Sequence, residues 1–178
     1  MSLEAASRVA GVGTSLSQTP ASILPSDLER FFGEPRSRTS LLAVSSAREE
    51  HRFLEQTFRG TCWKLHEAES YGAALMTLCR ERIRVVICQC SLPDGDWRDV
   101  LGQTAILPDA PRLIVTSPEP DDRLWAEVFN MGGYDVLTTP FDKSEVMWAV
   151  VAAWQSWETE WSRVKRARAK PNVFVLQA

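Results

Sequence analysis

The stretch Val85-Val-Ile-Cys-Gln-Cys-Ser-Leu-Pro-Asp-Gly-Asp96 changes from an apolar run to a polar turn within a few positions. A short apolar run bounded by turn residues is typical of a strand buried on both faces in a parallel sheet. Pro93 and Gly95 disfavour continuation of the strand and favour a reversal of the chain. The pattern predicts a central strand that ends near Gln89, where functional side chains gather in parallel sheets.

Short apolar runs of the same kind recur along the chain and alternate with segments of helical period. Where apolar residues recur every three or four positions, the chain is expected to form a helix with one buried face. Strands alternating with such helices indicate β-α units around a parallel sheet, which is an α/β fold. The expected strands are 41–44, a weaker 63–66, 85–88, 113–115 and 136–137, and the expected helices are 46–59, 71–82, 97–103, 122–130 and 142–164.

Two of the expected helices carry recognisable end signals. Ser46-Ala-Arg-Glu49 has the Ser-x-x-Glu pattern of a capping box, in which the serine hydroxyl caps the first turn. Gly60 and the pair Gly132-Gly133 can adopt the positive φ with which helices often stop. The sequence therefore predicts one helix that begins at Ser46 and ends near Gly60, and another that ends before Gly132.

The chain of 178 residues, 44% of them apolar, is long enough for one domain with a substantial core. Residues 1–38 are rich in Ser, Ala, Gly, Thr and Pro, so we expect a mostly flexible tail with a short helix near 26–32 that begins with a capping box. The domain is expected to span 39–157. Residues 158–178 are expected to extend the last helix and to end in a basic and apolar tail.

Charge and hydropathy exclude several classes of protein. A net charge of −3 offers no general attraction for nucleic acid, and no apolar run reaches the roughly 18 residues that span a bilayer. The N-terminus lacks the basic start and apolar stretch of a secretory signal. We therefore expect a cytoplasmic protein without a cofactor or a membrane segment. Packed thiols in a reducing compartment, rather than a metal site with His66, best explain Cys62, Cys79, Cys88 and Cys90.

Polar side chains follow four of the expected strands. Ser45 and Ser46 come after the first strand, Gln89 after the third, Thr116 after the fourth and Thr139 after the fifth. The carboxyl ends of parallel strands meet at one edge of the sheet, where ligands bind in doubly wound folds. The sequence therefore predicts one pocket assembled from four separate stretches.

This set of positions, with Ser-Leu-Pro-Asp-Gly-Asp at 91–96 and Met-Gly-Gly-Tyr-Asp-Val-Leu-Thr-Thr-Pro-Phe at 131–141, resembles the receiver domain of bacterial two-component response regulators. The resemblance covers about residues 39–157. It implies a flavodoxin-like, doubly wound sheet of five parallel strands in the order 2-1-3-4-5, followed here by an extended C-terminal helix.

The resemblance also implies a role for each pocket position, and this chain departs from most of them. The family has an acidic pair that holds Mg²⁺ where Ser45 and Ser46 stand, and a phosphate-accepting aspartate where Gln89 stands. It has a Ser or Thr at Thr116, which this chain keeps, and a lysine at Thr139. Mg²⁺ prefers carboxylate oxygens to hydroxyls and amides. We therefore expect a degenerate pseudo-receiver with a vestigial phosphoacceptor pocket, no catalytic residue, no metal and no enzymatic activity.

Two other interpretations of these residues are open. One is a flavodoxin-like binder of a flavin or cobalamin, although the chain has neither a Ser/Thr-rich phosphate loop of the flavodoxin type nor an Asp-x-His-x-x-Gly motif. The other makes Asp94 and Asp96 substitute acids. In a Pro-Asp-Gly-Asp turn, however, aspartates serve more simply as turn formers and helix caps.

The last expected helix is apolar on two faces. One face carries an apolar stripe, which should pack against the sheet. At 1.5 Å per residue this stripe is about 27 Å long, so we expect its end to project beyond the sheet. Trp148 and Ala152 point the opposite way. We expect these two residues to form an interaction face together with Trp125 on the preceding helix and Val136, and the partner to be a second copy of the chain or another signalling protein. Val136 stands where the family often has an aromatic switch residue. The stripe consists of Val146, Val150, Ala153, Trp154, Trp157, Trp161 and Val164.

The end of the chain is basic and then apolar. The cations between 163 and 170 complement the negative end of the helix dipole. They are not interleaved with aromatic residues, and no helix-turn-helix follows, so nucleic-acid binding is not expected. Residues 171–178 fit either a loose tail or a strand that adds to a sheet edge.

We therefore predict a phosphorylation-independent, receiver-like regulatory module. It is expected to act by protein–protein interaction or homodimerisation in signal transduction or transcriptional control. The alternative is a small-molecule sensor that binds a neutral polar ligand in the vestigial pocket through hydroxyl and amide hydrogen bonds.

Overall fold

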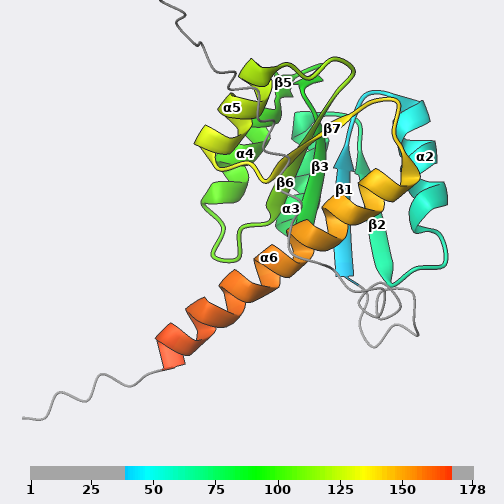
Figure 1. Ribbon diagram of the computed structural model, residues 1–178. Coiled ribbons are helices and arrows are strands. Elements are labelled where there is room, and N and C mark those ends of the chain that lie inside the picture. The colour runs from blue at the N-terminus through cyan, green and yellow to red at the C-terminus, as the bar shows by residue number, and fades with distance from the viewer. Residues whose placement is uncertain (1–38, 170–178) are drawn as a thin grey trace, which may run out of the picture.

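The computed structural model describes residues 39–169, which form a parallel sheet covered by helices on both faces (Figure 1). The strands of the sheet are β1 (Thr39–Val44), β2 (Trp63–Ala68), β3 (Ile83–Gln89), β6 (Arg112–Ser117) and β7 (Asp135–Thr138). They lie in the order β2-β1-β3-β6-β7, and all neighbouring strands are parallel. Counted along the chain this is the order 2-1-3-4-5, so the predicted doubly wound fold is confirmed.

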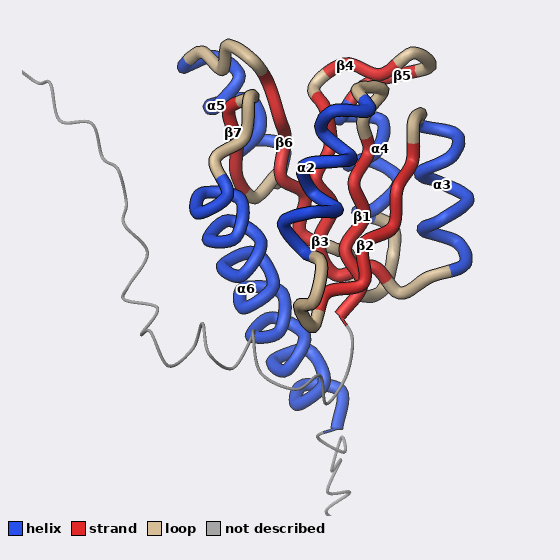
Figure 2. Tube along the Cα trace, turned by 90° about the vertical axis from the view of Figure 1, so that its right-hand side faces the viewer, coloured by secondary structure: helices blue, strands red, loops and turns tan. Residues whose placement is uncertain are grey.

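The helices form one layer on each face of the sheet (Figure 2). They are α2 (Arg48–Phe58), α3 (Tyr71–Arg80), α4 (Trp97–Ala105), α5 (Asp122–Met131) and α6 (Lys143–Ala169). The side chains of α2 and α6 share one core cluster with the sheet, and those of α3, α4 and α5 share the other. Two separate hydrophobic cores therefore sandwich the strands.

Strand β3 lies in the centre of the sheet and is buried on both faces. Val85 and Ile87 belong to the core beneath α2 and α6, whereas Val86 and Cys88 belong to the core beneath α3, α4 and α5. Successive side chains of a strand point to opposite faces, so a continuous apolar run is required at such a position. This confirms the prediction made from residues 85–88.

The predicted helix stops agree with the structure, but one predicted helix start is wrong. Gly60, with φ 77°, follows the end of α2, and Gly132, with φ 95°, caps α5. Helix α2 begins after Ala47, which makes no side-chain cap, so Ser46 does not form the expected capping box. The Ser46 hydroxyl instead donates a hydrogen bond to the side chain of Gln89, which a local pattern does not reveal.

The turn after β3 is also more ordered than the sequence indicated. Its residues form a small antiparallel hairpin, in which β4 (Ser91–Leu92) pairs with β5 (Gly95–Asp96) across Pro93. The side chain of Asp96 then caps α4 by accepting hydrogen bonds from the backbone N–H groups of Arg98 and Asp99. The prediction of a turn followed by a helix cap at Asp96 is confirmed.

Helix α6 has 27 residues and is therefore about 40 Å long. Val146, Val150, Ala153 and Trp157 are buried against the sheet, as the stripe predicted. The C-terminal part of the helix extends past the ends of the strands (Figure 1). Its last turns therefore have no sheet to pack against.

Several predictions concern residues outside the described range. The flexible tail at 1–38, its short helix near 26–32, and the tail at 171–178 all lie there. Between residues 39 and 169, no helix is long and apolar enough to cross a bilayer.

Candidate functional site

The predicted pocket residues lie at the carboxyl ends of four strands, along one edge of the sheet. Ser45 and Ser46 directly follow β1, and Gln89 is the last residue of β3. Thr116 on β6 is the register partner of Gln89, and Thr139 directly follows β7. We call these five residues the Gln89 site. The parallel register brings together positions that are far apart in the sequence.

The side-chain amide oxygen of Gln89 is the centre of the site. It accepts hydrogen bonds from the Ser45 hydroxyl at 3.1 Å, from the Ser46 backbone N–H at 3.0 Å and from the Ser46 hydroxyl at 3.2 Å. An amide nitrogen cannot accept these bonds, so the three donors determine which way the amide points. The Ser45 hydroxyl also accepts a bond from the Ala47 N–H at 3.0 Å, which ties the start of α2 to the same network.

Two residues in the first turns of α2 border this network. The buried His51 donates from Nε2 to the Ser45 carbonyl oxygen at 2.7 Å, so this nitrogen carries the proton. Burial raises the pKa of the Glu50 carboxyl, and contact with Ser45 and the neighbouring His51 offset part of that rise. Sequence analysis missed Glu50, although its place five residues after Ser45 in the helix following β1 is the signal that could have found it.

The two threonines of the Gln89 site do not join the network around the Gln89 amide. Thr116 is only 1% exposed, and its hydroxyl oxygen has no hydrogen-bond partner among residues 39–169. Thr139 is half-buried, and its backbone N–H donates to the Ser117 carbonyl oxygen at 3.0 Å, which anchors the end of β7 to β6. The site therefore consists of a paired amide–serine network beside a buried, unpaired hydroxyl.

The aspartates of the turn after β3 are engaged in holding the backbone. Asp94 accepts hydrogen bonds from the Tyr71 N–H at 2.7 Å and the Gly72 N–H at 2.9 Å, in the first turn of α3. These backbone bonds lower the pKa of the Asp94 carboxyl. Asp96 caps α4 and also accepts from the Arg98 guanidinium at 2.8 Å. Neither aspartate is free to replace the missing acids.

The cysteines and acids of the described residues do not assemble a metal site. Between residues 39 and 169, no three side chains of His, Cys, Asp or Glu come together in a way that could hold an ion. Cys88 is buried directly before Gln89, and burial raises the pKa of its thiol. A thiol with a raised pKa stays protonated, so Cys88 is a packing residue and a poor nucleophile.

The expected interaction face is only partly present. Trp148 is 40% exposed on α6, and Trp125 and Ala152 are half-buried. Val136 is only 2% exposed and packs in the core beneath α3, α4 and α5, so its assignment to an exposed face is wrong. Helices cover both faces of the sheet, so Val136 and its neighbour Leu137 are both buried, on opposite faces. Phe129 and Met131 on α5, which sequence analysis missed, are exposed.

No family model matches the chain, and no curated protein matches it by sequence. Solved structures do match. The signal receiver domain of an HD domain-containing protein from Pseudomonas fluorescens Pf-5 superposes with a TM-score of 0.66 at 26% identity, covering 74% of this chain and 97% of that chain. The chain has the fold of a response-regulator receiver domain.

Two further receiver structures agree with this fold at lower identity. A CheY-like response regulator receiver domain protein from Methanospirillum hungatei JF-1 gives a TM-score of 0.62 at 16% identity, covering 70% of this chain and 99% of that chain. A two-component response regulator from Clostridium difficile gives 0.59 at 17%, covering 66% and 96%. The match extends over nearly the whole of each receiver structure.

Replacement of Gln89 tests the role of its amide in stability. Gln89→Leu leaves the hydroxyls and the N–H of Ser45 and Ser46 without their acceptor, so we expect the free energy of unfolding to fall by about 1–3 kcal/mol. Gln103→Leu, at an exposed position on α4, is the matched control and should change it by less than about 0.5 kcal/mol. Urea denaturation measures both. Equal effects would mean that the amide network contributes nothing.

The raised pKa of Glu50 predicts a dependence of stability on pH. The folded protein binds the Glu50 proton more tightly than the unfolded chain, so this residue's contribution to stability falls as pH rises from the ordinary value of 4.5 through the higher folded pKa. Glu50→Gln should therefore be more stable than the wild type at pH 7, and the difference should shrink near pH 4. Glu49→Gln, at an exposed position of the same turn, is the control. A flat difference across this range would contradict the burial of a charged Glu50.

Proposed function

We propose that this chain is a phosphorylation-independent, receiver-like regulatory module that acts through protein–protein contact in signal transduction or transcriptional control. The observation that supports it most directly is the amide oxygen of Gln89, which accepts bonds from both Ser45 and Ser46. By resemblance, receivers have a phosphate-accepting aspartate and its acidic, metal-holding partners at these positions. In this chain the side chains at these positions, Gln89, Ser45 and Ser46, are hydrogen-bonded to one another.

The chemistry of the Gln89 site supports the absence of phosphotransfer. An amide is not a nucleophile at neutral pH, and the serine hydroxyls of the site already donate to it. Mg²⁺ binding requires carboxylate or comparable oxygen ligands. Glu50 lies beside Ser45, but its raised pKa shows that this environment disfavours its charge. A single disfavoured carboxylate is a poor substitute for a charged cluster, so we propose that the module is not an enzyme.

The exposed apolar residues around β7 support a role in protein–protein contact. Strand β7 is an edge strand, and α5 and α6 both pack against it. Phe129 and Met131 on α5 and Trp148 on α6 expose large apolar side chains. Such side chains are more favourable against a partner than in water. We propose a second copy of the chain, or another cytoplasmic signalling protein, as the partner.

One observation favours the alternative of a small-molecule sensor. The buried Thr116 hydroxyl has no partner among the described residues, and a neutral polar ligand could satisfy it. The amide oxygen of Gln89, which such a ligand would also need, is already engaged. We therefore place this alternative second. A metabolite that raises the melting temperature of the wild type, but not of Gln89→Leu, would reverse that order.

Phosphorylation chemistry provides a direct test. Wild-type protein incubated with acetyl phosphate and Mg²⁺ should gain no phosphoryl group in its intact mass. Gln89→Asp alone should also gain none, because Ser45, Ser46 and Thr139 still leave the metal and the phosphoryl group unsupported. A receiver that retains its acidic residues is the positive control. A phosphoryl adduct on the wild type would refute phosphorylation independence, and one on Gln89→Asp would show that the rest of the site remains competent.

The oligomeric state tests the proposed contact face. If the α6 face forms a homodimer, light scattering behind size exclusion should give a dimer for the wild type and a folded monomer for Trp148→Glu. Met76→Glu changes a side chain that is 53% exposed on α3, so it is the matched control and should leave the dimer intact. Loss of the dimer in both variants would point to general destabilisation. A wild-type monomer would eliminate the homodimer.

A further inference from the structure

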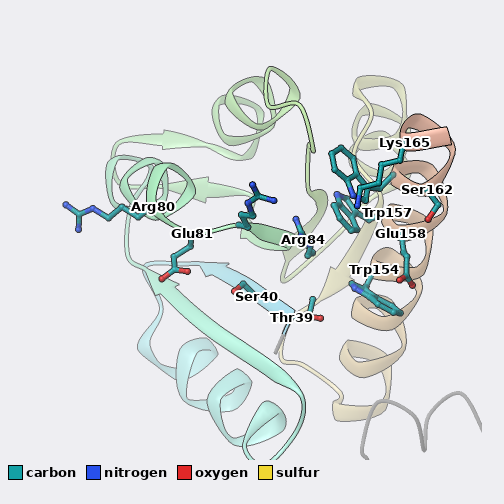
Figure 3. A pocket seen from close by; sticks show the side chains of 12 residues that line it. Thr39, Ser40, Arg80, Glu81, Arg84, Trp154, Trp157, Glu158, Ser162 and Lys165 are labelled. Atoms are coloured by element: carbon teal, nitrogen blue, oxygen red, sulfur yellow. The ribbon is translucent and has the colours of Figure 1, made fainter. Parts of the chain in front are cut away.

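A groove of about 610 Å³ lies at the opposite end of the sheet from the Gln89 site (Figure 3). Thr39 and Ser40, at the amino end of β1, form part of its lining. Helix α6 forms the facing wall, with the half-buried Trp154, the buried Trp157 and, one turn farther toward the C-terminus, Trp161. The groove therefore lies where α6 passes the amino ends of the strands and continues beyond them.

The aromatic wall of the groove is held in place by several contacts. The indole N–H of Trp157 donates to the Asp109 carbonyl oxygen at 3.3 Å. The Arg84 guanidinium lies over the Trp157 ring at 4.1 Å and pairs with the Asp109 carboxylate at 3.2 Å. Trp161, which is half-buried, stacks on Trp157 with ring centroids 5.8 Å apart. The wall is therefore formed before any occupant arrives, which lowers the entropic cost of binding.

The lining of the groove has four cations and two carboxylates, Glu81 and Glu158, so it carries a net positive charge. Arg82 and Lys165 are exposed and form no ion pair within residues 39–169. Lys165 lies over the Trp161 ring at 5.2 Å. Arg80 is also in the lining, but Figure 3 shows it extending away from the indoles. Free cations beside indole rings favour an occupant that is both acidic and aromatic.

The chain itself contains such a segment a few residues before Thr39, which lines the groove. Residues 26–34 read Ser-Asp-Leu-Glu-Arg-Phe-Phe-Gly-Glu and carry three carboxylates and one cation. Leu28, Phe31 and Phe32 have the i, i+3, i+4 spacing of one helix face. The segment lies outside the described residues, and the chain that leads back to it begins at Thr39, inside the lining of the groove.

The connection is long enough for the segment to reach the aromatic wall. Phe32 and Thr39 are seven positions apart, which allows up to about 24 Å in an extended chain. Along α6, the distance from Trp154 to Lys165 is about 16 Å. A short tether also gives an effective concentration on the order of millimolar, which a second copy of the chain does not reach at ordinary protein concentrations.

We propose that residues 26–34 dock into this groove of their own chain, with Phe31 and Phe32 against the indoles and the carboxylates near Arg82 and Lys165. The docked segment then covers the side of α6 that lines the groove. A protein partner with a similar acidic and aromatic segment can bind there only by displacing it. This inference uses neither the Gln89 site nor the exposed surface around Trp148, so its test is independent of the test of the proposed function.

A competition experiment on the full chain tests this docking. The probe is a fluorescently labelled peptide with the sequence of residues 24–35, which keeps the three carboxylates and the single cation of the segment, and anisotropy measures its binding. In the wild type the tethered segment occupies the groove. In the double variant Phe31→Ser with Phe32→Ser, the segment loses its aromatic contacts and leaves the groove open. The double variant should therefore bind the peptide at least about tenfold more tightly than the wild type. Leu3→Ser with Val9→Ser removes apolar residues elsewhere in the same tail and should behave as the wild type does.

A second set of variants locates the binding on the groove. Added to the double variant, Arg82→Glu should weaken peptide binding several-fold, and so should Trp161→Ala. Arg82 is exposed, so its replacement keeps the test valid even if Trp161→Ala does not fold. Equal peptide binding by the wild type and the double variant, or binding by neither, would overturn the proposal. So would a wild-type dimer that the double variant converts to a monomer, because the occupant would then be a second copy.

Discussion

The burial of β3 on both faces is the constraint on which the rest of the structure depends. Val85 and Ile87 pack into one core, Val86 and Cys88 into the other, and the helices of both layers meet the sheet through them. Its doubly buried part, residues 85–88, is apolar at every position, and the next residue along the chain is polar. That residue is Gln89, which is therefore placed at the carboxyl edge of the sheet beside Ser45 and Thr116.

The two ends of the sheet differ in chemistry. At the carboxyl edge, polar groups other than the Thr116 hydroxyl bond to one another, because the Gln89 amide oxygen accepts three bonds and Asp94 and Asp96 accept bonds from backbone N–H groups. At the amino edge, α6 outruns the strands and presents indoles and cations beside the start of β1. Both binding surfaces that we propose involve α6 and lie away from the carboxyl ends of the strands.

Much of the fold and of the candidate site could be predicted from local patterns. The apolar runs located all five strands of the parallel sheet, and Gly60 and Gly132 marked the ends of two helices. The positions of the Gln89 site followed, because the carboxyl ends of parallel strands meet. The part that failed involved contacts between distant residues. Ser46 was predicted to cap a helix but bonds to Gln89, 43 positions away, and Val136 was assigned to an interaction face but lies in the core.

By itself, the sequence determined the order of strands and helices, the central place of β3 and which polar residues follow the strands, because periodicity and residue type are local properties. Only the tertiary structure decided that Glu50 lies beside Ser45, that the Thr116 hydroxyl is left unpaired, and that the projecting part of α6 forms a groove with Thr39. Each of these depends on how separate elements pack at a particular register and length, and no single stretch of sequence contains that information.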